Sequence, residues 1–411
     1  MLNLNKNQKY LLACSHGPDS MALFYMLKEE GYNFAVAHVN YHLREESNLE
    51  QQQLEAYCKK VNVQLFVKDV DEYLGNNNLE EKCRVIRYSF FKDLVNQYDF
   101  DAVLIAHNQD DLIETYLMQK RRQNLVQFFG IKENPIIFDV KIIRPLLSYS
   151  KQELLMFCDL NKVEYSIDKT NLEDVFLRNK IRHEVVEIMN KNDRQKILKE
   201  IDEENKKLEI INEKISRITT NKCEEYNRLT DEEFLYALVN KGRELKPNFT
   251  MSRNQGLEIR KIFLSDKANI SVNVDGLTLV KSYDSFQFLD KNKEVDFSYK
   301  IDEPTILDTE YFYLDFTCDT SNRNVSKNDY PITVRNAKPN DTYLIKGYEK
   351  QLRRLFIDWK VPTPLRKRWP VIVNKDGTII YVPRYQKDFK REDNCNFYVK
   401  WKPLIAFFFI L

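Results

Sequence analysis

Two different spacings of hydrophobic residues alternate along the first 150 residues. Short apolar runs, each long enough for one buried strand, are separated by stretches in which apolar residues recur at helical spacing. Such alternation predicts parallel strands joined by right-handed crossovers, and therefore a doubly wound α/β sheet. The apolar runs are residues 10–14, 34–39, 63–67 and 102–106, and the helical stretches are 21–27, 46–60 and 79–97.

The pattern changes beyond residue 150. A helix is predicted for 151–160, and a charged helical stretch at 187–217 has the thin apolar stripe of a connecting helix. A helix at 252–264 and several short alternating runs then indicate smaller α+β modules. We therefore expect four segments: a catalytic domain over 1–190, a linker helix over 191–217, a central module over 218–325 and a C-terminal module over 326–411.

Polar residues follow three of the predicted strands, at the edge where doubly wound sheets bind ligands. The first cluster, Ser15 to Ser20, lies between a strand and a helix and contains Gly17. A tight turn that leads into a helix directs backbone N–H groups at one point, which suits phosphate. The alternative is an ordinary turn in which Asp19 or Ser20 caps the helix. These six residues alone leave both interpretations open.

The cluster after the fourth strand carries Asp110, Asp111 and Glu114. If a helix begins near Asp110, the three side chains share one face, where they could meet ATP-bound magnesium or an ammonium group. The alternative is that acidic residues simply complement the helix dipole. His38 and His107 each end a strand, where a hydrogen-bonded structural histidine is the commoner case.

Two pairs of arginines occur at helical spacing. Arg84 and Arg87 are three residues apart, and Arg178 and Arg182 are four apart. Each pair would lie on one helical face. Surface salt bridges are the default interpretation, and binding of a triphosphate or of RNA is the alternative.

Composition limits the function without naming it. A chain of 411 residues with a formal charge of +1 predicts several domains and no global attraction to nucleic acid. The seven cysteines form no CxxC pair, which disfavours a zinc or iron–sulfur site and fits a reducing compartment. The start lacks an apolar signal-peptide core, and the apolar run 404–411 is too short to span a bilayer, so we expect a cytoplasmic protein whose last segment is a buried strand.

One region departs from this neutrality. Residues 331–370 hold ten Lys or Arg against three Asp or Glu, with the aromatic residues Tyr348, Phe356, Trp359 and Trp369 interleaved. Basic residues with aromatics suit RNA phosphates and unstacked bases. The alternative is a solvated helix face beside aromatic residues of the module's own core.

The turn SHGPDS resembles the SGGxDS loop of the ATP-pyrophosphatase superfamily, whose members adenylate a substrate and release pyrophosphate. Within that superfamily the chain resembles the tRNA(Ile)-lysidine synthetase family, with an N-terminal domain of the adenine nucleotide α-hydrolase type. The resemblance is weaker at 252–289 and 332–373. It is carried by residues 38–47, 78–88, 106–115, 144–147 and 168–185.

The chain departs from the family pattern at three places. His16 stands where the loop's first glycine is usual, and Tyr41 and His42 stand where the family has His and Gly. Asn108 takes the position of a second histidine. A side chain at residue 16 fits only if the backbone there needs neither a positive φ nor a very close approach to phosphate.

The resemblance implies a two-step reaction. The 2-carbonyl oxygen of the wobble cytidine in a CAU-anticodon tRNA(Ile) attacks the α-phosphate of ATP, and the ε-amine of free L-lysine then displaces AMP to give lysidine. It also implies that the C-terminal basic module binds the tRNA, and it leaves a homodimer open. The residues it assigns are the loop Ser15, His16, Gly17, Pro18, Asp19 and Ser20 for ATP phosphates, Asp19 for Mg²⁺, backbone near His38 for adenine, Asp110 and Glu114 for lysine, and Arg84 and Arg178 for phosphate charge.

Two rival functions remain. A tRNA thiolase of the same superfamily would need sulfur-carrying cysteines or a cluster, and Cys14, Cys58 and Cys83 show no suitable pairing. A non-catalytic tRNA-binding homologue would follow if His16 has spoiled the loop.

Overall fold

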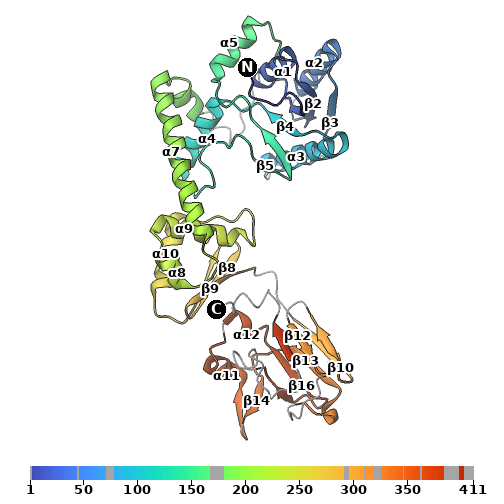
Figure 1. The fold of residues 1–411 in the computed structure, drawn as a ribbon, viewed down its shortest axis with the longest axis vertical. Helices are drawn as coiled ribbons and strands as arrows, with labels where there is room; N and C mark the ends of the chain where they lie inside the picture. The colour runs from blue at the N-terminus through green and yellow to red at the C-terminus, as the bar shows by residue number, and fades with distance from the viewer. Residues whose placement is uncertain are drawn as a thin grey trace. The chain divides into compact units, whose positions relative to one another are not determined.

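The structure is a computed structural model of the 411-residue chain. It forms two compact units, residues 1–208 and 209–411, each described here by itself (Figure 1). The residues that the structure describes are 2–43, 46–70, 78–123, 125–166, 180–290, 296–309, 312–317, 325–345, 347–361, 363–383 and 398–401.

The first unit is built on a six-stranded sheet in the order β3-β2-β1-β4-β6-β5. Every neighbouring pair is parallel except β5 and β6, which are antiparallel. The strands are β1 (Lys9–Ala13), β2 (Asn33–Asn40), β3 (Leu65–Asp69), β4 (Ala102–Ile105), β5 (Ile136–Ile137) and β6 (Val140–Ile143).

Helices cover both faces of this sheet, which confirms the predicted doubly wound α/β fold. Leu12, Val36 and Leu104 pack in one core cluster with α1, α2 and α5, whereas the alternate residues Leu11 and Val103 pack with α3 on the other face (Figure 1). The helices of this unit are α1 (Pro18–Glu29), α2 (Glu46–Val61), α3 (Leu79–Tyr98), α4 (Gln109–Arg122) and α5 (Lys151–Leu160).

The chain that follows α5 packs against α4. A single π-helical turn, η1 (Arg182–Val186), precedes the long helix α7 (Lys191–Ser216). Ile113 of α4 packs against Ile181, Val186 and the α7 residue Ile197. The predicted connecting helix therefore exists, and its first turns belong to the core beside α4. Residues 167–179, which include Asp168 and Arg178, lie outside the described part of the chain.

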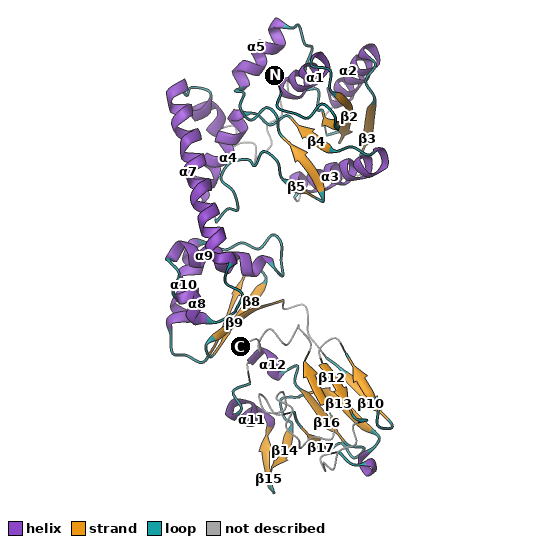
Figure 2. Cartoon of the chain, in the orientation of Figure 1, coloured by secondary structure: helices purple, strands orange, loops and turns teal. Residues whose placement is uncertain are grey.

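The second unit begins with a three-stranded antiparallel sheet next to short helices (Figure 2). The predicted helix at 252–264 and the three strands that follow it are present. The elements are α8 (Cys223–Asn227), α9 (Asp231–Arg243), α10 (Arg253–Leu264), β7 (Asn269–Val274), β8 (Leu277–Ser282) and β9 (Ser285–Asp290).

The remaining strands form a separate module with its own core around the fully buried Trp369. Its sheets have the orders β10-β13-β16-β17, β11-β12-β18 and β14-β15. The elements are β10 (Ser298–Ile301), β11 (Ile306–Asp308), β12 (Phe312–Asp315), η2 (Lys327–Asp329), β13 (Ile332–Asn336), β14 (Thr342–Ile345), β15 (Tyr348–Gln351), α11 (Leu352–Asp358), α12 (Thr363–Arg366), β16 (Pro370–Val373), β17 (Ile379–Tyr381) and β18 (Tyr398–Trp401).

The strand pairing bears on the module boundary that the sequence predicted at 325/326. Strand β10 pairs with β13, and β12 pairs with β18. Phe297, Phe312 and Phe316 belong to the C-terminal core. We therefore propose that the C-terminal module begins between residues 290 and 297. Short strands with irregular connections carry no boundary signal of their own in the sequence.

Within the described residues, no helix has both the length and the apolar character needed to cross a membrane. The run 404–411, predicted as a final buried strand, lies outside those residues.

Candidate active site

The turn between β1 and α1 has the geometry of an anion cradle. Helix α1 begins at Pro18, with Gly17 as N-cap and no side-chain cap, so Asp19 and Ser20 lie inside the helix and neither caps it. The Ser20 hydroxyl donates to the Gly17 carbonyl at 2.9 Å and accepts from the Ser15 N–H at 3.3 Å, which fixes the turn. The N–H groups of Asp19 and Ser20 belong to the first helical turn, where a helix offers no internal acceptor.

His16 adopts a positive φ of 64° in this turn. Histidine enters that left-handed region more readily than most side chains, although glycine is the residue without strain there. The imidazole is buried, its Nδ1 lies 2.9 Å from Ser166 Oγ, and the Ser166 N–H donates to the His16 carbonyl at 2.9 Å. Burial, together with the nearby His38, lowers the pKa of His16. The ring is therefore packed against Ser166 and does not stand at the mouth of the turn.

The other two departures from the family pattern also have structural roles. His42 takes a positive φ of 50° and bonds Asn48 at 2.9 Å and Asp69 at 3.1 Å through its two ring nitrogens. The Tyr41 hydroxyl donates to the Cys83 carbonyl of α3 at 2.8 Å. Asn108 caps α4: its side chain accepts from the Asp111 N–H while the Asp111 carboxylate accepts from the Asn108 N–H, both at 3.0 Å.

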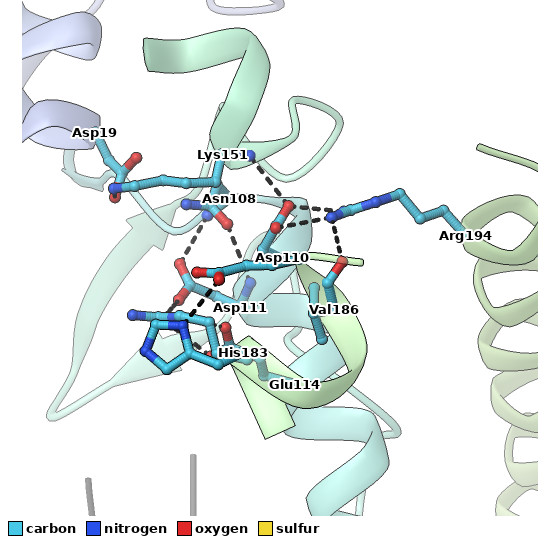
Figure 3. A network of polar contacts seen from close by, with 11 residues as sticks. Asp19, Asn108, Asp110, Asp111, Glu114, Lys151, His183, Val186 and Arg194 are labelled. Carbon is cyan, nitrogen blue, oxygen red and sulfur yellow. Dashed lines mark hydrogen bonds and ion pairs between the residues drawn. The ribbon is translucent and has the colours of Figure 1, made fainter. Parts of the chain in front are cut away.

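Asp19 faces a single ammonium group. Lys151 Nζ lies 2.7 Å from Asp19 Oδ2, and the buried Oδ1 has no hydrogen-bond partner among the described residues (Figure 3). Burial raises the pKa of Asp19, and Lys151 opposes that shift. An unpartnered carboxylate oxygen beside a phosphate-type turn fits Mg²⁺, which binds one or two carboxylates, water and substrate phosphates. The described residues contain no cluster of three or more His, Cys, Asp or Glu that could hold a metal by itself.

Asp110, predicted to hold lysine, has both oxygens occupied. Arg194 of α7 donates to Oδ1 at 2.8 Å and to Oδ2 at 2.9 Å, and the Lys151 backbone N–H donates to Oδ1 at 3.0 Å (Figure 3). The carboxylate is buried. This arrangement favours a structural role, in which Asp110 joins the starts of α4, α5 and α7.

Glu114, one turn deeper in α4, is fully buried against Arg182. The guanidinium donates to its two oxygens at 2.6 and 3.0 Å, and the same group lies 3.4 Å from Asp111 Oδ1. Burial would lower the pKa of Arg182, but the Glu114 carboxylate outweighs it and raises that pKa. Of the three α4 carboxylates, Asp111 is the most exposed, at 23% of its side chain. Asp111 and Glu114 therefore form an acidic pair that shares the single positive charge of Arg182.

A cationic cluster lies behind β4. Arg144 is buried and donates to two neutral acceptors, His107 Nδ1 at 2.8 Å and the Lys132 carbonyl. Burial lowers the pKa of Arg144, and the neighbouring positive charge of Arg84 adds to that effect. The Arg84 guanidinium also stacks 5.1 Å from the centre of the Tyr88 ring. Two neighbouring guanidinium groups, one of which donates only to neutral acceptors among the described residues, suit an anion.

His38 and the cysteines have structural surroundings. The buried His38 donates from Nδ1 to the Cys14 carbonyl at 2.9 Å, which ties β2 to the end of β1. Burial raises the pKa of Cys14 and Cys83, and it raises that of Cys58 to about 12. Reactive cysteines need a lowered pKa. These three thiols are therefore poor sulfur carriers.

The basic stretch 331–370 is only partly available for RNA. Phe356 and Trp369 are core residues and Trp359 packs partly against that core, so these three aromatics follow the core alternative. Tyr348 is exposed, as are Arg353 and Arg354 on α11.

Comparison with known proteins agrees with this geometry. Residues 1–189 match the PP-loop domain family, and residues 332–401 match the TilS substrate C-terminal domain family. A tRNA(Ile)-lysidine synthase from Mycoplasma mycoides subsp. mycoides SC is 31% identical, over 92% of this chain and 98% of that protein. The chain belongs to the tRNA(Ile)-lysidine synthase family.

A second tRNA(Ile)-lysidine synthase, from Ureaplasma parvum serovar 3, is 43% identical over 44% of this chain and 56% of its own length. Among solved structures, the U34-tRNA thiolase NcsA from Methanococcus maripaludis has 19% identity and a TM-score of 0.42, over 49% of this chain and 74% of that chain. Membership of the tRNA(Ile)-lysidine synthase family, predicted from the sequence motifs, is thus confirmed by a full-length relative.

The structure adds residues to the site that sequence reasoning had not selected. Arg182 had a visible signal, because it is four residues from Arg178, but only Arg178 was chosen. Arg144 stands in the RPLL stretch that carries the resemblance, without an assigned role. Lys151 and Arg194 gave no local signal, since their partners lie 132 and 84 residues away in the chain.

Proposed function

We propose that this protein uses ATP to join free L-lysine to the 2-carbon of the wobble cytidine in CAU-anticodon tRNA(Ile), forming lysidine and changing the codon read from AUG to AUA. The observation that carries the proposal is the turn at Ser15–Ser20 and its link to the acidic residues of α4. The Lys151 ammonium contacts Asp19 of this turn, and the Lys151 backbone N–H donates to Asp110 of α4. The turn that would bind the nucleotide and the acidic cluster that would bind lysine therefore lie side by side in one unit.

In the first step, the cytidine 2-carbonyl oxygen attacks the α-phosphate of ATP, a new O–P bond forms and pyrophosphate leaves. The turn amides and the start of α1 bind the departing phosphates. Backbone groups near His38, which is fixed to the end of β1, contact adenine. Mg²⁺ bound at Asp19 would neutralise phosphate charge as pyrophosphate leaves. Because these groups are positioned before the reaction, they stabilise the developing charge without further rearrangement.

In the second step, the lysine ε-amine attacks the 2-carbon and the C–O bond to AMP breaks. Only the neutral amine is a nucleophile, so the site must hold the lysine and accept a proton. We assign these tasks to Asp111 and Glu114, because Asp110 is held by Arg194, which is only 15% exposed, whereas Arg182, the partner of Glu114, is 37% exposed and could give way to an incoming ammonium group. Arg182 offsets one of the two negative charges of the pair, and an incoming ammonium group would bring the same positive charge to it.

The negative charge that develops on AMP needs cations close to the reacting carbon. Arg84 and the buried Arg144 are the described arginines that we assign to this task. Arg178, the other residue predicted for it, lies outside the described residues and remains a prediction.

The exposed basic residues of the C-terminal module, Arg353 and Arg354 among them, would contact tRNA phosphates, which position a nucleic acid without reading its sequence. We further propose that the protein works in the cytoplasm, as a monomer or a homodimer.

One assay separates this function from its rivals. The full-length protein is incubated with ATP, labelled lysine and CAU-anticodon tRNA, and labelled tRNA, AMP and pyrophosphate are counted. The ligase predicts equal amounts of all three. A thiolase would consume ATP without incorporating lysine. A non-catalytic homologue would bind the tRNA and release no pyrophosphate, and either result would refute the proposal.

A further inference from the structure

The Lys151 ammonium contacts Asp19 in the turn between β1 and α1, although the two residues are 132 positions apart in the sequence. Lys151 is the first residue of α5, and its ammonium lies 2.7 Å from Asp19 Oδ2 (Figure 3). The ammonium carries three N–H donors, so it can bind a second acceptor while it keeps or exchanges its contact with Asp19.

The backbone of Lys151 is fixed at this position. Its N–H donates to Asp110 Oδ1, and Arg194 holds the same carboxylate. Ser150 caps α5 in a reciprocal pair with Glu153, which fixes where the helix begins. A long flexible side chain thus starts from a rigid point beside the turn.

The ammonium remains accessible. The Lys151 side chain is 35% exposed and that of Asp19 is 24% exposed, so the pair lies at the open edge of the turn. Lys151 supplies the positive charge that the Asp19 carboxylate needs in a largely buried place.

Nucleotide binding changes that balance. A magnesium ion at Asp19 would bring two positive charges to a carboxylate that already has an ammonium at hydrogen-bond distance, and like charges so close repel each other. The polyphosphate offers charged oxygen acceptors at the same turn. The movement with the lowest cost is therefore a short displacement of the Lys151 ammonium from Asp19 to a phosphate oxygen.

We propose that Lys151 is a nucleotide-binding residue, whose ammonium holds Asp19 in the free protein and passes to the polyphosphate when Mg²⁺–ATP binds. The inference rests on the proposed function in so far as that function places ATP at this turn. It adds to the site a residue that no motif at the turn contains.

The test measures binding and needs no turnover. Calorimetry on the full chain records the affinity for Mg²⁺ with α,β-methylene-ATP, and electron paramagnetic resonance records the affinity for Mn²⁺ alone. Lys151→Met should weaken binding of the analogue by about tenfold or more, because a charge-assisted contact is lost. The same change should leave Mn²⁺ binding equal or tighter, since a competing cation is gone. Lys151→Arg should bind the analogue within about threefold of the unchanged protein.

Lys162→Met is the matched control, because Lys162 is an exposed lysine just beyond the other end of α5, and both affinities should stay unchanged. If Lys151→Met does not fold, Lys151→Gln replaces it with the same expected result. Analogue binding by the methionine or glutamine variant as tight as in the unchanged protein would overturn the inference, and so would an unchanged protein that binds no analogue. Loss of analogue binding in Lys151→Met, combined with no lysidine formation by the unchanged protein, would refute the proposed function and leave the role of Lys151 standing.

Discussion

Arg194 binds both carboxylate oxygens of Asp110, at 2.8 and 2.9 Å, across 84 residues of sequence. The same guanidinium donates to the Val186 carbonyl at 2.8 Å, which also fixes the turn before α7. Both side chains are largely buried, at 15% and 7% exposure. The pair therefore joins the linker helix to the helix that carries the acidic pair Asp111 and Glu114.

Replacing Arg194 with Met should destabilise the first unit by about 3–5 kcal/mol, because a buried carboxylate then loses its charged partner. The three tryptophans at 359, 369 and 401 all lie in the second unit, so their fluorescence monitors that unit alone. Urea unfolding should show an earlier loss of helical circular dichroism with no shift in the tryptophan transition.

The matched control for Arg194→Met is Lys206→Met, on the same helix, whose exposed pair with Asp202 should be worth less than about 1 kcal/mol. Equal effects of the two changes would show that the Asp110 pair contributes no more than a surface contact.

His16→Gly tests whether the imidazole takes part in nucleotide binding. Glycine removes the strain of the positive φ, but the buried ring and its contact with Ser166 are lost. We expect a net loss of about 1–2 kcal/mol in stability and an affinity for α,β-methylene-ATP within about threefold. A tenfold loss of affinity in a folded His16→Gly protein would mean that the ring contacts the nucleotide. His42→Gly, at the other positive-φ histidine, is the control.

Stability should also depend on pH through His16. Its pKa is lowered in the folded protein by burial and by His38, from an ordinary value of 6.5. The unfolded chain then binds more protons, so the stabilising contribution is complete above 6.5 and is lost as the pH falls through the lower folded pKa. Unfolding measured between about pH 5 and 7.5 should show stability rising with pH, and His16→Asn should flatten that slope. An unchanged slope in His16→Asn would assign the effect to another group.

The RNA-binding role of the C-terminal module is tested by its salt dependence. Arg353 and Arg354 are exposed neighbours on α11, and replacing both with Ala should weaken tRNA binding. If both arginines contact phosphates, the negative slope of log affinity against log salt should become less steep by about two, because each phosphate contact contributes nearly one unit of slope. Lys300→Ala, in the same module and paired with the exposed Asp302, should leave the slope unchanged. A slope that does not respond to the double change would place the tRNA contacts elsewhere.

The elements around the site could be predicted from the sequence, because each has a local signal. The apolar run before Gly17 and the helical spacing after it predict the turn, and the acidic residues after β4 predict the start of α4 within a residue or two. The contact between Asp110 and Arg194 could not be predicted locally, since Arg194 comes from a helix whose sequence has the pattern of a solvated linker. The departure at His16 was visible, but only the three-dimensional structure shows the ring packed against Ser166.

The same limit explains the C-terminal module. Basic and aromatic residues alternate there in the sequence, but burial decides which of them can meet RNA. Trp369 and the α11 residue Phe356 are buried in the core. Arg353 and Arg354 lie on the exposed side of α11. A seven-residue helix such as α11 is too short for its periodicity to separate the buried residues from the exposed ones.

The central claim is tested most directly by the chemical identity of the wobble nucleoside. CAU-anticodon tRNA is treated with the protein, ATP and lysine, digested to nucleosides and analysed by mass spectrometry, with the Glu114→Gln variant in parallel. We expect lysidine at the wobble position with the unchanged protein, and cytidine when lysine or ATP is omitted. Glu114→Gln should lower the rate by about 100-fold or more, because the acidic pair then holds lysine poorly. Unmodified or thiolated cytidine in the complete reaction would mean that the protein does not form lysidine.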